Sequence, residues 1–150
     1  MNASNTAAER QVFTFGVPWE GAFGYVQAVK VKDTIYVSGQ LSHDPAGNLV
    51  APAAVRDDGR PQDYSTMEAQ MRQTYQNAVT VLAHYGATLA DVVEETLFVL
   101  DVPAAFQAAT TVRKEVYGTP APACASNLIG VTQLAFPQQL IEITFRAVVD

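Results

Sequence analysis

The strongest constraint on the fold is a helical repeat between residues 66 and 86, in a chain whose other periodic segments are mostly strand-like. Apolar or small side chains return every three or four residues from Met67 to Tyr85, and Gly86 stands where a helix commonly ends. The preceding segment, Ser65 to Glu68, has the form of a capping box. A helix with one apolar stripe must bury it against another element, so the pattern predicts a helix packed on a sheet.

The rest of the chain reads mostly as strands, with one further helix. Alternation of apolar and polar side chains predicts strands, and Pro103 suits the first turn of a second helix that ends at Gly118. The predicted strands cover residues 11–16, 25–30, 34–40, 91–100, 125–134 and 140–149. This order predicts an α+β fold with a single six-stranded mixed sheet and two helices on one face.

The expected domain covers residues 11–150, preceded by a mobile polar arm over residues 1–10. Trp19 and Glu20 are expected in a loop that contains proline and glycine. The segment 41–62 has no periodicity, which predicts either a functional flap or an excursion from the body of the domain.

Composition excludes several classes of protein. Acidic residues outnumber basic ones 15 to 9, giving a formal net charge of −6, so clustered Lys and Arg for nucleic acid are missing. No basic amphipathic stretch suggests a membrane surface, and no apolar run resembles a signal peptide. Cys124 is the single cysteine, and two histidines show no ligand spacing. We therefore expect a cytoplasmic protein with no metal and no cofactor.

The last predicted strand has two unlike faces. Ile141, Ile143 and Phe145 lie on one face and suit the side covered by helices. Glu142 and Arg146 lie on the other face, which is polar but not rich in lysine. Such a face is typical of contact with a ligand or another subunit, although a plain solvated face fits as well. The low charged fraction of 16% also favours a surface covered by another subunit.

Several segments together resemble the RidA (YjgF-type) family of reactive-intermediate deaminases. They are Gly24–Val29, Ile35–Gln40, the helix over residues 70–86, and the segments 91–101 and 140–143, and the resemblance extends over about residues 12–149. It implies a chorismate-mutase-like fold, packed as a homotrimer with small-molecule pockets in clefts between subunits. It also implies hydrolysis of enamines and imines that pyridoxal-phosphate enzymes release, which frees ammonia and a keto acid.

The same resemblance assigns site residues. Tyr25 matches the family's pocket tyrosine, Gly39 is retained, and Glu142 matches the glutamate that helps handle water. The family's carboxylate-clamping arginine falls on Ser126, and no arginine lies between Lys114 and Arg146. The chain thus resembles a divergent branch, and loss of the charged fork predicts an altered substrate range.

The candidate residues also have structural interpretations. Glu142 is a catalytic base or a carboxylate hydrogen-bonded at an interface. Ser126 and Asn127 are substrate-binding hydrogen-bond donors or ordinary strand polarity. Arg146 is expected to form an ion pair at an interface, and Cys124 is expected to be a small buried side chain. His43 could act as an acid or base at the mouth of the pocket. His84 is expected to interact with the dipole at the end of its helix.

Three functions follow from these observations. The leading hypothesis is a small-molecule hydrolase of the enamine/imine deaminase type that acts in clefts between subunits. The alternative is a non-catalytic ligand-binding or chaperone-like trimer, in which the clefts remain without chemistry. Ribonuclease activity is a third possibility, which the acidic charge opposes. An arginine of an adjacent subunit, such as Arg113, could replace the missing clamp.

Overall fold

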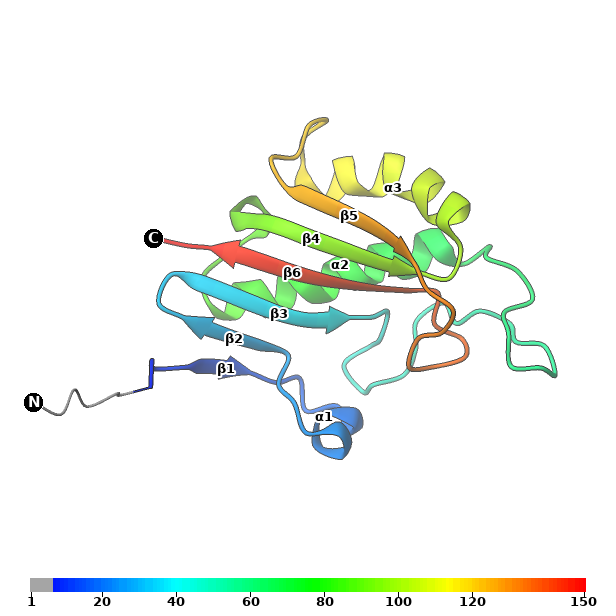
Figure 1. Ribbon diagram of the computed structural model, residues 1–150, viewed down its shortest axis with the longest axis horizontal. Helices are drawn as coiled ribbons and strands as arrows, with labels where there is room; N and C mark the ends of the chain where they lie inside the picture. Colours follow the sequence, from blue (N-terminus) through cyan, green and yellow to red (C-terminus); the bar gives the residue numbers. More distant parts are fainter. Residues whose placement is uncertain (1–6) are drawn as a thin grey trace, which may run out of the picture.

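A single six-stranded mixed sheet forms the body of the molecule, as predicted. The computed structural model describes residues 7–150, and the strands lie in the order β1-β2-β3-β6-β4-β5 (Figure 1). Only β4 and β5 pair in parallel among these strands. The strands are β1 (Gln11–Phe13), β2 (Ala28–Val31), β3 (Thr34–Gln40), β4 (Val92–Val99), β5 (Ala125–Gly130) and β6 (Ile141–Val148).

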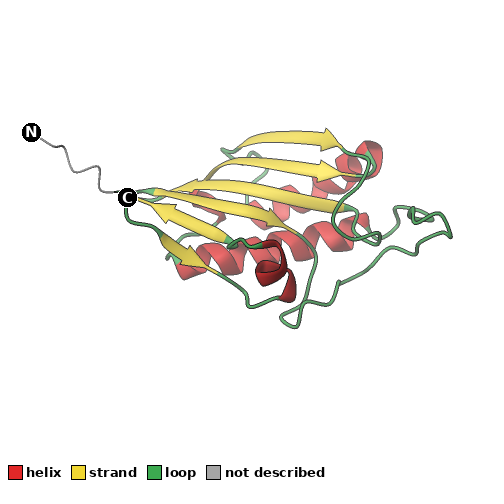
Figure 2. Cartoon of the chain, turned by 60° about the horizontal axis from the view of Figure 1, so that its bottom comes forward, coloured by secondary structure: helices red, strands yellow, loops and turns green. Residues whose placement is uncertain are grey.

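Two long helices cover one face of the sheet, which confirms the predicted layers (Figure 2). They are α2 (Met67–His84) and α3 (Val102–Tyr117), and α3 begins with a proline in its first turn. The sheet meets them with the apolar face of β6, where Ile141 and Ile143 are fully buried. Within residues 7–150 no long helix covers the opposite face of the sheet, and Glu142, Thr144 and Arg146 lie on it in alternation with the buried set. We call these the covered face and the open face.

The end of α2 agrees with its sequence, whereas its start does not. Gly86 has φ +70°, and the amides of Gly86 and Ala87 donate to the carbonyls of Ala83 and Leu82, which forms a Schellman motif. The predicted capping box at Ser65 is wrong. The Ser65 hydroxyl donates to the Asp63 carboxylate at 2.6 Å, because this local acceptor competes with the helix end.

A short helix, α1 (Pro18–Phe23), replaces the loop expected around Trp19 and Glu20. Pro18 supplies a φ suited to the first helical turn. The Glu20 carboxylate turns back and accepts hydrogen bonds from the amides of Phe15, Gly16 and Val17 at 2.7–2.9 Å. These contacts satisfy three backbone amides at the entry to the helix, which would otherwise lack acceptors. The helix therefore forms although it is short.

The segment 41–66 is an excursion that Figure 2 shows extending away from the body. It contains only two isolated bridges, His43 with Leu49 and Val55 with Pro61. Buried amides of α2 anchor its ends, since Asn77 donates to the Leu41 and His43 carbonyls and Gln70 donates to the Ala51 carbonyl. The expected arm over residues 1–10 lies outside the described residues for its first six positions, and residues 7–10 are exposed without regular structure.

Strand β3 is irregular where it passes the open face of β6. Val37 pairs with Phe145, but the next pair is Gln40 with Ile143. Three steps on β3 therefore match two on β6, which is the mark of a β-bulge at Ser38 and Gly39. The bulge brings the backbone of Gly39 against the side chain of Glu142. A 3-10 turn, η1 (Leu89–Asp91), precedes β4, and no described helix is both long and apolar enough to cross a membrane.

Candidate functional site

Glu142 lies directly on Gly39. A β-carbon built at Gly39 would be 2.4 Å from Cδ and 2.7 Å from Oε2 of Glu142. Only a glycine leaves that space, so the bulge and the missing side chain together create the seat of this carboxyl group. No described residue donates a hydrogen bond to Glu142. Partial burial without such a donor raises the pKa of Glu142 above its ordinary value.

Tyr25 lies at the end of a chain of buried amides that starts at Gln40, the residue after Gly39. The Gln40 Nε2 donates to the Ser38 carbonyl and to Gln27 Oε1, each at 2.9 Å. Because Ser38 offers a carbonyl, the Gln40 atom must be the nitrogen, which fixes the orientation of Gln27 as well. Gln27 Nε2 then donates to the Tyr25 hydroxyl oxygen at 3.4 Å.

The direction of this chain decides what the Tyr25 hydroxyl can do. Its oxygen accepts from Gln27, so its own hydrogen is free to be donated to a ligand. Burial raises the pKa of Tyr25, the hydrogen bond from Gln27 and the proximity of the Trp19 side chain lower it, and the charges of Glu20 and Glu142 raise it. The hydroxyl therefore keeps its hydrogen at neutral pH.

Two further polar atoms near these residues lack partners among the described residues. They are the acceptor Oε1 of Gln40, which is buried beside Gly39, and the indole Nε1 of Trp19. Buried polar atoms without partners are uncommon and often belong to ligand sites.

Ser126 and Asn127 do not share a face, so the structure divides the predicted site. They are neighbours on β5, and successive side chains of a strand point to opposite faces. Asn127 Nδ2 donates to Thr96 Oγ1 at 3.4 Å on the open face. Ser126 Oγ donates to Glu95 Oε1 at 2.9 Å on the covered face, away from Glu142. Within one chain, strand parity therefore places Ser126 and Glu142 on opposite faces of the sheet.

Glu95 organises a polar cluster that sequence reasoning did not identify. Its side chain is fully buried and ion-pairs with the Arg113 Nε at 2.5 Å. The Tyr75 and Tyr117 hydroxyls donate to its other oxygen at 2.8 and 2.7 Å. Burial and the charge of Glu95 raise the pKa of both tyrosines, so they remain donors. With Ser126, four donors satisfy both oxygens of this carboxylate, and the alternation of β4 with Leu97 and Val99 could have indicated its buried side.

Arg113 belongs to this cluster within its own chain. It stands next to Ser126, the position where the resemblance placed the missing arginine, because both bind the same oxygen of Glu95. The sequence predicts that Arg113 could reach this position from an adjacent subunit, whereas within one chain its guanidinium already comes from α3 to Glu95 beside Ser126. No other chain is needed to bring it there.

The remaining candidates have local structural contacts. His43 is buried, its Nδ1 lies 2.8 Å from the Asp44 carbonyl, and its ring packs edge-on against Phe15 and Trp19. Cys124 is half-buried and accepts a 3.6 Å contact from Tyr117, and burial raises the pKa of its thiol. The Arg146 guanidinium lies over the Tyr36 ring and 4.0 Å from Glu94.

His84, in the last turn of α2, packs against Phe13 and Tyr85. Within residues 7–150 no group of three or more His, Cys, Asp or Glu side chains is placed to hold a metal ion.

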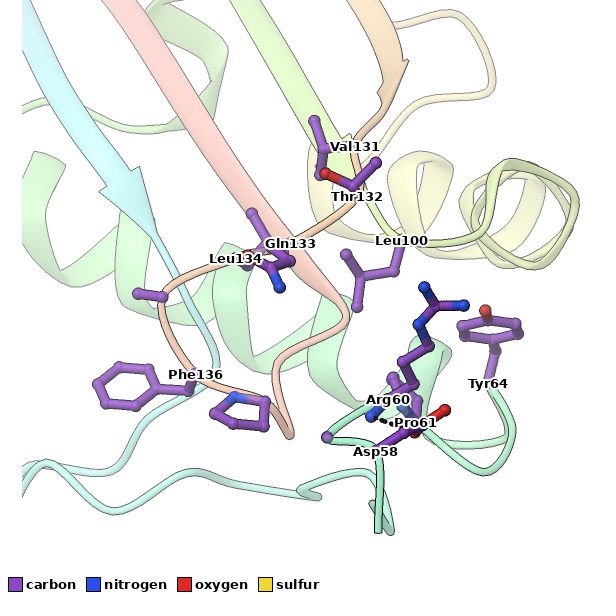
Figure 3. A pocket seen from close by; sticks show the side chains of 13 residues that line it. Asp58, Arg60, Pro61, Tyr64, Leu100, Val131, Thr132, Gln133, Leu134 and Phe136 are labelled. Atoms are coloured by element: carbon purple, nitrogen blue, oxygen red, sulfur yellow. Dashed lines mark hydrogen bonds between the residues drawn. The ribbon is translucent and has the colours of Figure 1, made fainter. Parts of the chain in front are cut away.

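A further cavity lies elsewhere, between the excursion and the loop after β5. It has a volume of about 740 Å³ and is lined on one side by Arg60 and Tyr64 and on the other by Leu134 and Phe136 (Figure 3). Arg60 projects into it from the exposed turn at Gly59, and Leu100 lies at its inner end. None of Tyr25, Gly39 and Glu142 lines this cavity.

Comparison with known proteins gives consistent matches over most of the chain. The sequence profile of the family described as Endoribonuclease L-PSP matches residues 19–149. A protein of Dermatophagoides farinae named 2-iminobutanoate/2-iminopropanoate deaminase is 33% identical over 110 residues, covering 73% of this chain and 74% of that protein. The RutC family protein YjgH of Escherichia coli (strain K12) is 30% identical over 111 residues, covering 74% and 73%.

A solved structure agrees with the fold. The crystal structure of a Mycobacterium tuberculosis member of the YjgF/YER057c/UK114 family superposes with a TM-score of 0.72 at 26% identity, covering 94% of this chain and all of that one. The profile match, the relatives and the fold together place this chain in the RidA (YjgF-type) family, which is also described as Endoribonuclease L-PSP.

Proposed function

We propose that this protein hydrolyses small imines and their enamine tautomers, with Glu142 as the catalytic acid and base. The observation that carries the proposal is the seat of the Glu142 carboxyl group on Gly39, which directly precedes Gln40, the start of the hydrogen-bonded chain to Tyr25. A half-buried carboxyl group with a raised pKa suits a group that both takes up and gives back a proton. The name of the Dermatophagoides farinae relative, an iminobutanoate/iminopropanoate deaminase, supports this reaction class.

The reaction adds water across a carbon–nitrogen double bond. The Glu142 carboxylate takes a proton from water while the oxygen bonds to the imine carbon, and the electron pair of the double bond passes to nitrogen, which receives that same proton from Glu142 to give a carbinolamine. The Glu142 carboxylate then takes the hydroxyl proton and passes it to the nitrogen as the carbon–oxygen double bond forms and the carbon–nitrogen bond breaks. Ammonia and a carbonyl product leave, and the carboxylate is restored.

Tyr25 positions the substrate in this scheme. Its free hydrogen points to an acceptor, such as an imine nitrogen or a carbonyl oxygen, because Gln27 occupies the tyrosine oxygen. Gln27 and Gln40 hold that direction from within the core, so they act as positioning residues. The unpartnered Oε1 of Gln40 and the backbone of Gly39 offer further contacts to a small polar ligand.

We further propose that the protein works as a homotrimer. Within one chain, Ser126 and Glu142 lie on opposite faces of the sheet. A second copy of the chain is therefore needed to bring the Ser126 of one subunit and the Glu142 carboxyl group of another to the same ligand. The open face exposes Tyr36 and Val148, which are 49% and 40% accessible, as a partner surface would. A Val148→Asp substitution should dissociate the assembly in sedimentation experiments, and a monomeric wild-type protein would contradict the proposal.

Ammonia release from freshly generated imines of short amino acids tests the chemistry. We expect Glu142→Gln to lower the rate by about 10²–10⁴-fold and Glu94→Gln, on the same face but beside Arg146, to leave it near the wild-type value. An unchanged rate in Glu142→Gln would show that this carboxyl group is not the acid or base. The rates for imines of neutral and of acidic amino acids should be compared, because the loss of the arginine on β5 predicts a changed range of substrates.

A non-catalytic ligand-binding trimer is the second candidate. Ser126 favours it, because its hydroxyl hydrogen is engaged by Glu95 and is not offered to a substrate. Ligand-dependent thermal shifts without ammonia release from any imine would support this function. Multiple turnover would exclude it.

A further inference from the structure

The short helix α1 holds Trp19 in a fixed position. The indole ring packs edge-on against His43 and Phe136, with ring centres 5.3 and 5.4 Å away. A β-carbon added at Gly47 would lie 3.3 Å from the indole Cζ3, so the backbone of the excursion also passes close to the ring. Two segments far from α1 in the sequence, the excursion and the loop before β6, therefore restrain Trp19 before any ligand binds.

The polar edge of this ring has no partner within the described chain. The indole Nε1 is buried and donates to no acceptor among residues 7–150. A buried N–H without an acceptor costs about 1–3 kcal/mol relative to one that is paired. A rigid ring that keeps such an atom is typical of a residue whose acceptor is a ligand.

A second free donor lies near this N–H. The turn after α1 folds Tyr25 back onto the helix, since the Tyr25 amide donates to the Glu20 carbonyl at 3.1 Å. The Trp19 side chain is close enough to the Tyr25 hydroxyl to lower its pKa. The Tyr25 oxygen accepts from Gln27, which leaves the hydroxyl hydrogen for another acceptor. A carbonyl oxygen has two lone pairs and matches this pair of donors.

The charges around these donors disfavour an anion. Those that act on the Tyr25 hydroxyl belong to Glu20 and Glu142, and both raise its pKa. Glu20 is buried and held by three backbone amides, so its carboxylate stays in place. Both carboxylates would repel a charged ligand, whereas an uncharged carbonyl group needs only the two neutral donors.

We propose that Trp19 is a specificity-determining residue of the Glu142 site, and that its N–H and the Tyr25 hydroxyl bind the oxygen of an uncharged carbonyl group. The preferred substrates are then imines that carry an amide or ester in place of a free carboxylate. Phe23 is 83% exposed and packs edge-on against Tyr25 with ring centres 5.7 Å apart, which adds an apolar surface for a short side chain. Imino acids remain substrates, with a higher KM.

This inference rests on the proposed function only where it identifies the bound carbonyl compound as an imine. Binding at Trp19 does not require turnover at Glu142. Binding is therefore measured separately from ammonia release, so that either proposal can fail alone.

Trp19 is the only tryptophan in the sequence, so its fluorescence reports directly on this site. Titration of the whole chain with 2-oxobutanamide should change the emission and saturate. We expect the Kd to be at least about fivefold lower than that for 2-oxobutanoate, because the acid meets the charges of Glu20 and Glu142. Equal affinity, tighter binding of the acid, or no saturable binding of the amide would overturn the inference.

Two variants remove one donor each and keep an aromatic ring. Trp19→Phe and Tyr25→Phe should each raise the Kd of the amide about three- to tenfold in titration calorimetry, the equivalent of one lost hydrogen bond. Tyr36→Phe, which changes a partly exposed tyrosine on the open face, is the control and should leave the Kd unchanged.

Wild-type affinity for the amide in either donor variant would overturn the inference, even if imines are hydrolysed. Binding of the amide that depends on Trp19, together with wild-type ammonia release in Glu142→Gln, would overturn the proposed function and leave the Trp19 site in place.

Discussion

Glu95 on β4 and Glu142 on β6 are glutamates of neighbouring strands with opposite surroundings. Glu95 faces the helices, is fully buried and receives four hydrogen-bond donors, including the guanidinium of Arg113. Glu142 faces away from the helices, is partly buried and receives no donor from the described residues, so the pKa of its carboxyl group is raised.

The difference separates a structural carboxylate from a reactive one. Donors on every side hold the charge of Glu95 in place, which makes it a fixed anchor for other side chains. Burial without donors leaves Glu142 ready to exchange a proton. Residue type alone did not distinguish them, whereas the side of the sheet on which each one lies does.

The largest expected effect is on stability. Glu95→Gln removes the anion that holds Arg113 and two tyrosines, and breaking such a buried pair should lower the free energy of unfolding by about 3 kcal/mol. Glu142→Gln removes a partly buried charge without a partner and should not destabilise at pH 7. Urea denaturation of both variants measures the contrast, and equal losses would remove the distinction between the two glutamates.

Gly39→Ala should damage activity more than folding. The new β-carbon collides with Cδ and Oε2 of Glu142 and moves the carboxyl group. Displacement of a reacting group by about 1 Å can cost up to 10²-fold in rate, so we expect ammonia release to fall at least about tenfold. Gly21→Ala is the matched control, because a β-carbon there meets nothing within 4 Å. Equal rates in the two variants would show that the seat of Glu142 is unimportant.

Tyr117→Phe tests how much one tyrosine hydroxyl contributes to the Glu95 cluster on the covered face. It removes one of the two donors to Glu95 Oε2 while the ring keeps its packing. We expect a loss of about 1 kcal/mol in the free energy of unfolding, the usual contribution of one hydrogen bond. Tyr36→Phe, on the open face, changes a partly exposed hydroxyl and serves as the control. A loss as large as that of Glu95→Gln would mean that the tyrosine, not the ion pair, holds the cluster.

The smallest effect concerns pH. Because burial raises the pKa of Glu142, the folded protein binds a proton that the unfolded chain has already released. Relative to Glu142→Gln, the wild type should therefore be least stable near neutral pH. This deficit should shrink as pH falls through the folded pKa and vanish below the ordinary glutamate value of about 4.3. A constant difference between the two proteins across pH 4–8 would contradict the raised pKa.

The sequence predicted the architecture because periodicity reports burial directly. The helix ending at Gly86, the alternation of β6 and the order of elements follow from local patterns, and Glu142 is placed on the open face by parity alone. Helix α1 was not predicted, although Pro18 and Glu20 carry its signals, because a proline near glycines also fits a loop.

The site was harder to predict because it depends on contacts between distant segments. Because successive side chains of β5 point to opposite faces, Ser126 and Asn127 cannot bind the same ligand within one chain. This alternation does not predict which of the two residues faces the helices. Arg113 reaches Glu95 across 18 residues of sequence, from a helix to a strand. Only the packing of α3 on the sheet reveals that pair.

The bulge in β3 has a consequence for how this site is encoded. The extra residue between Val37 and Gln40 shifts the phase of the strand, so Gly39 meets Glu142 instead of continuing the buried row of Ile35 and Val37. Deleting one residue there would restore an unbroken ladder and turn Gly39 toward the helices. The pocket around Glu142 thus depends on the number of residues in β3 as much as on their side chains. Deletion of a single residue from the bulge could remove the pocket even though Glu142 and Tyr25 were both retained.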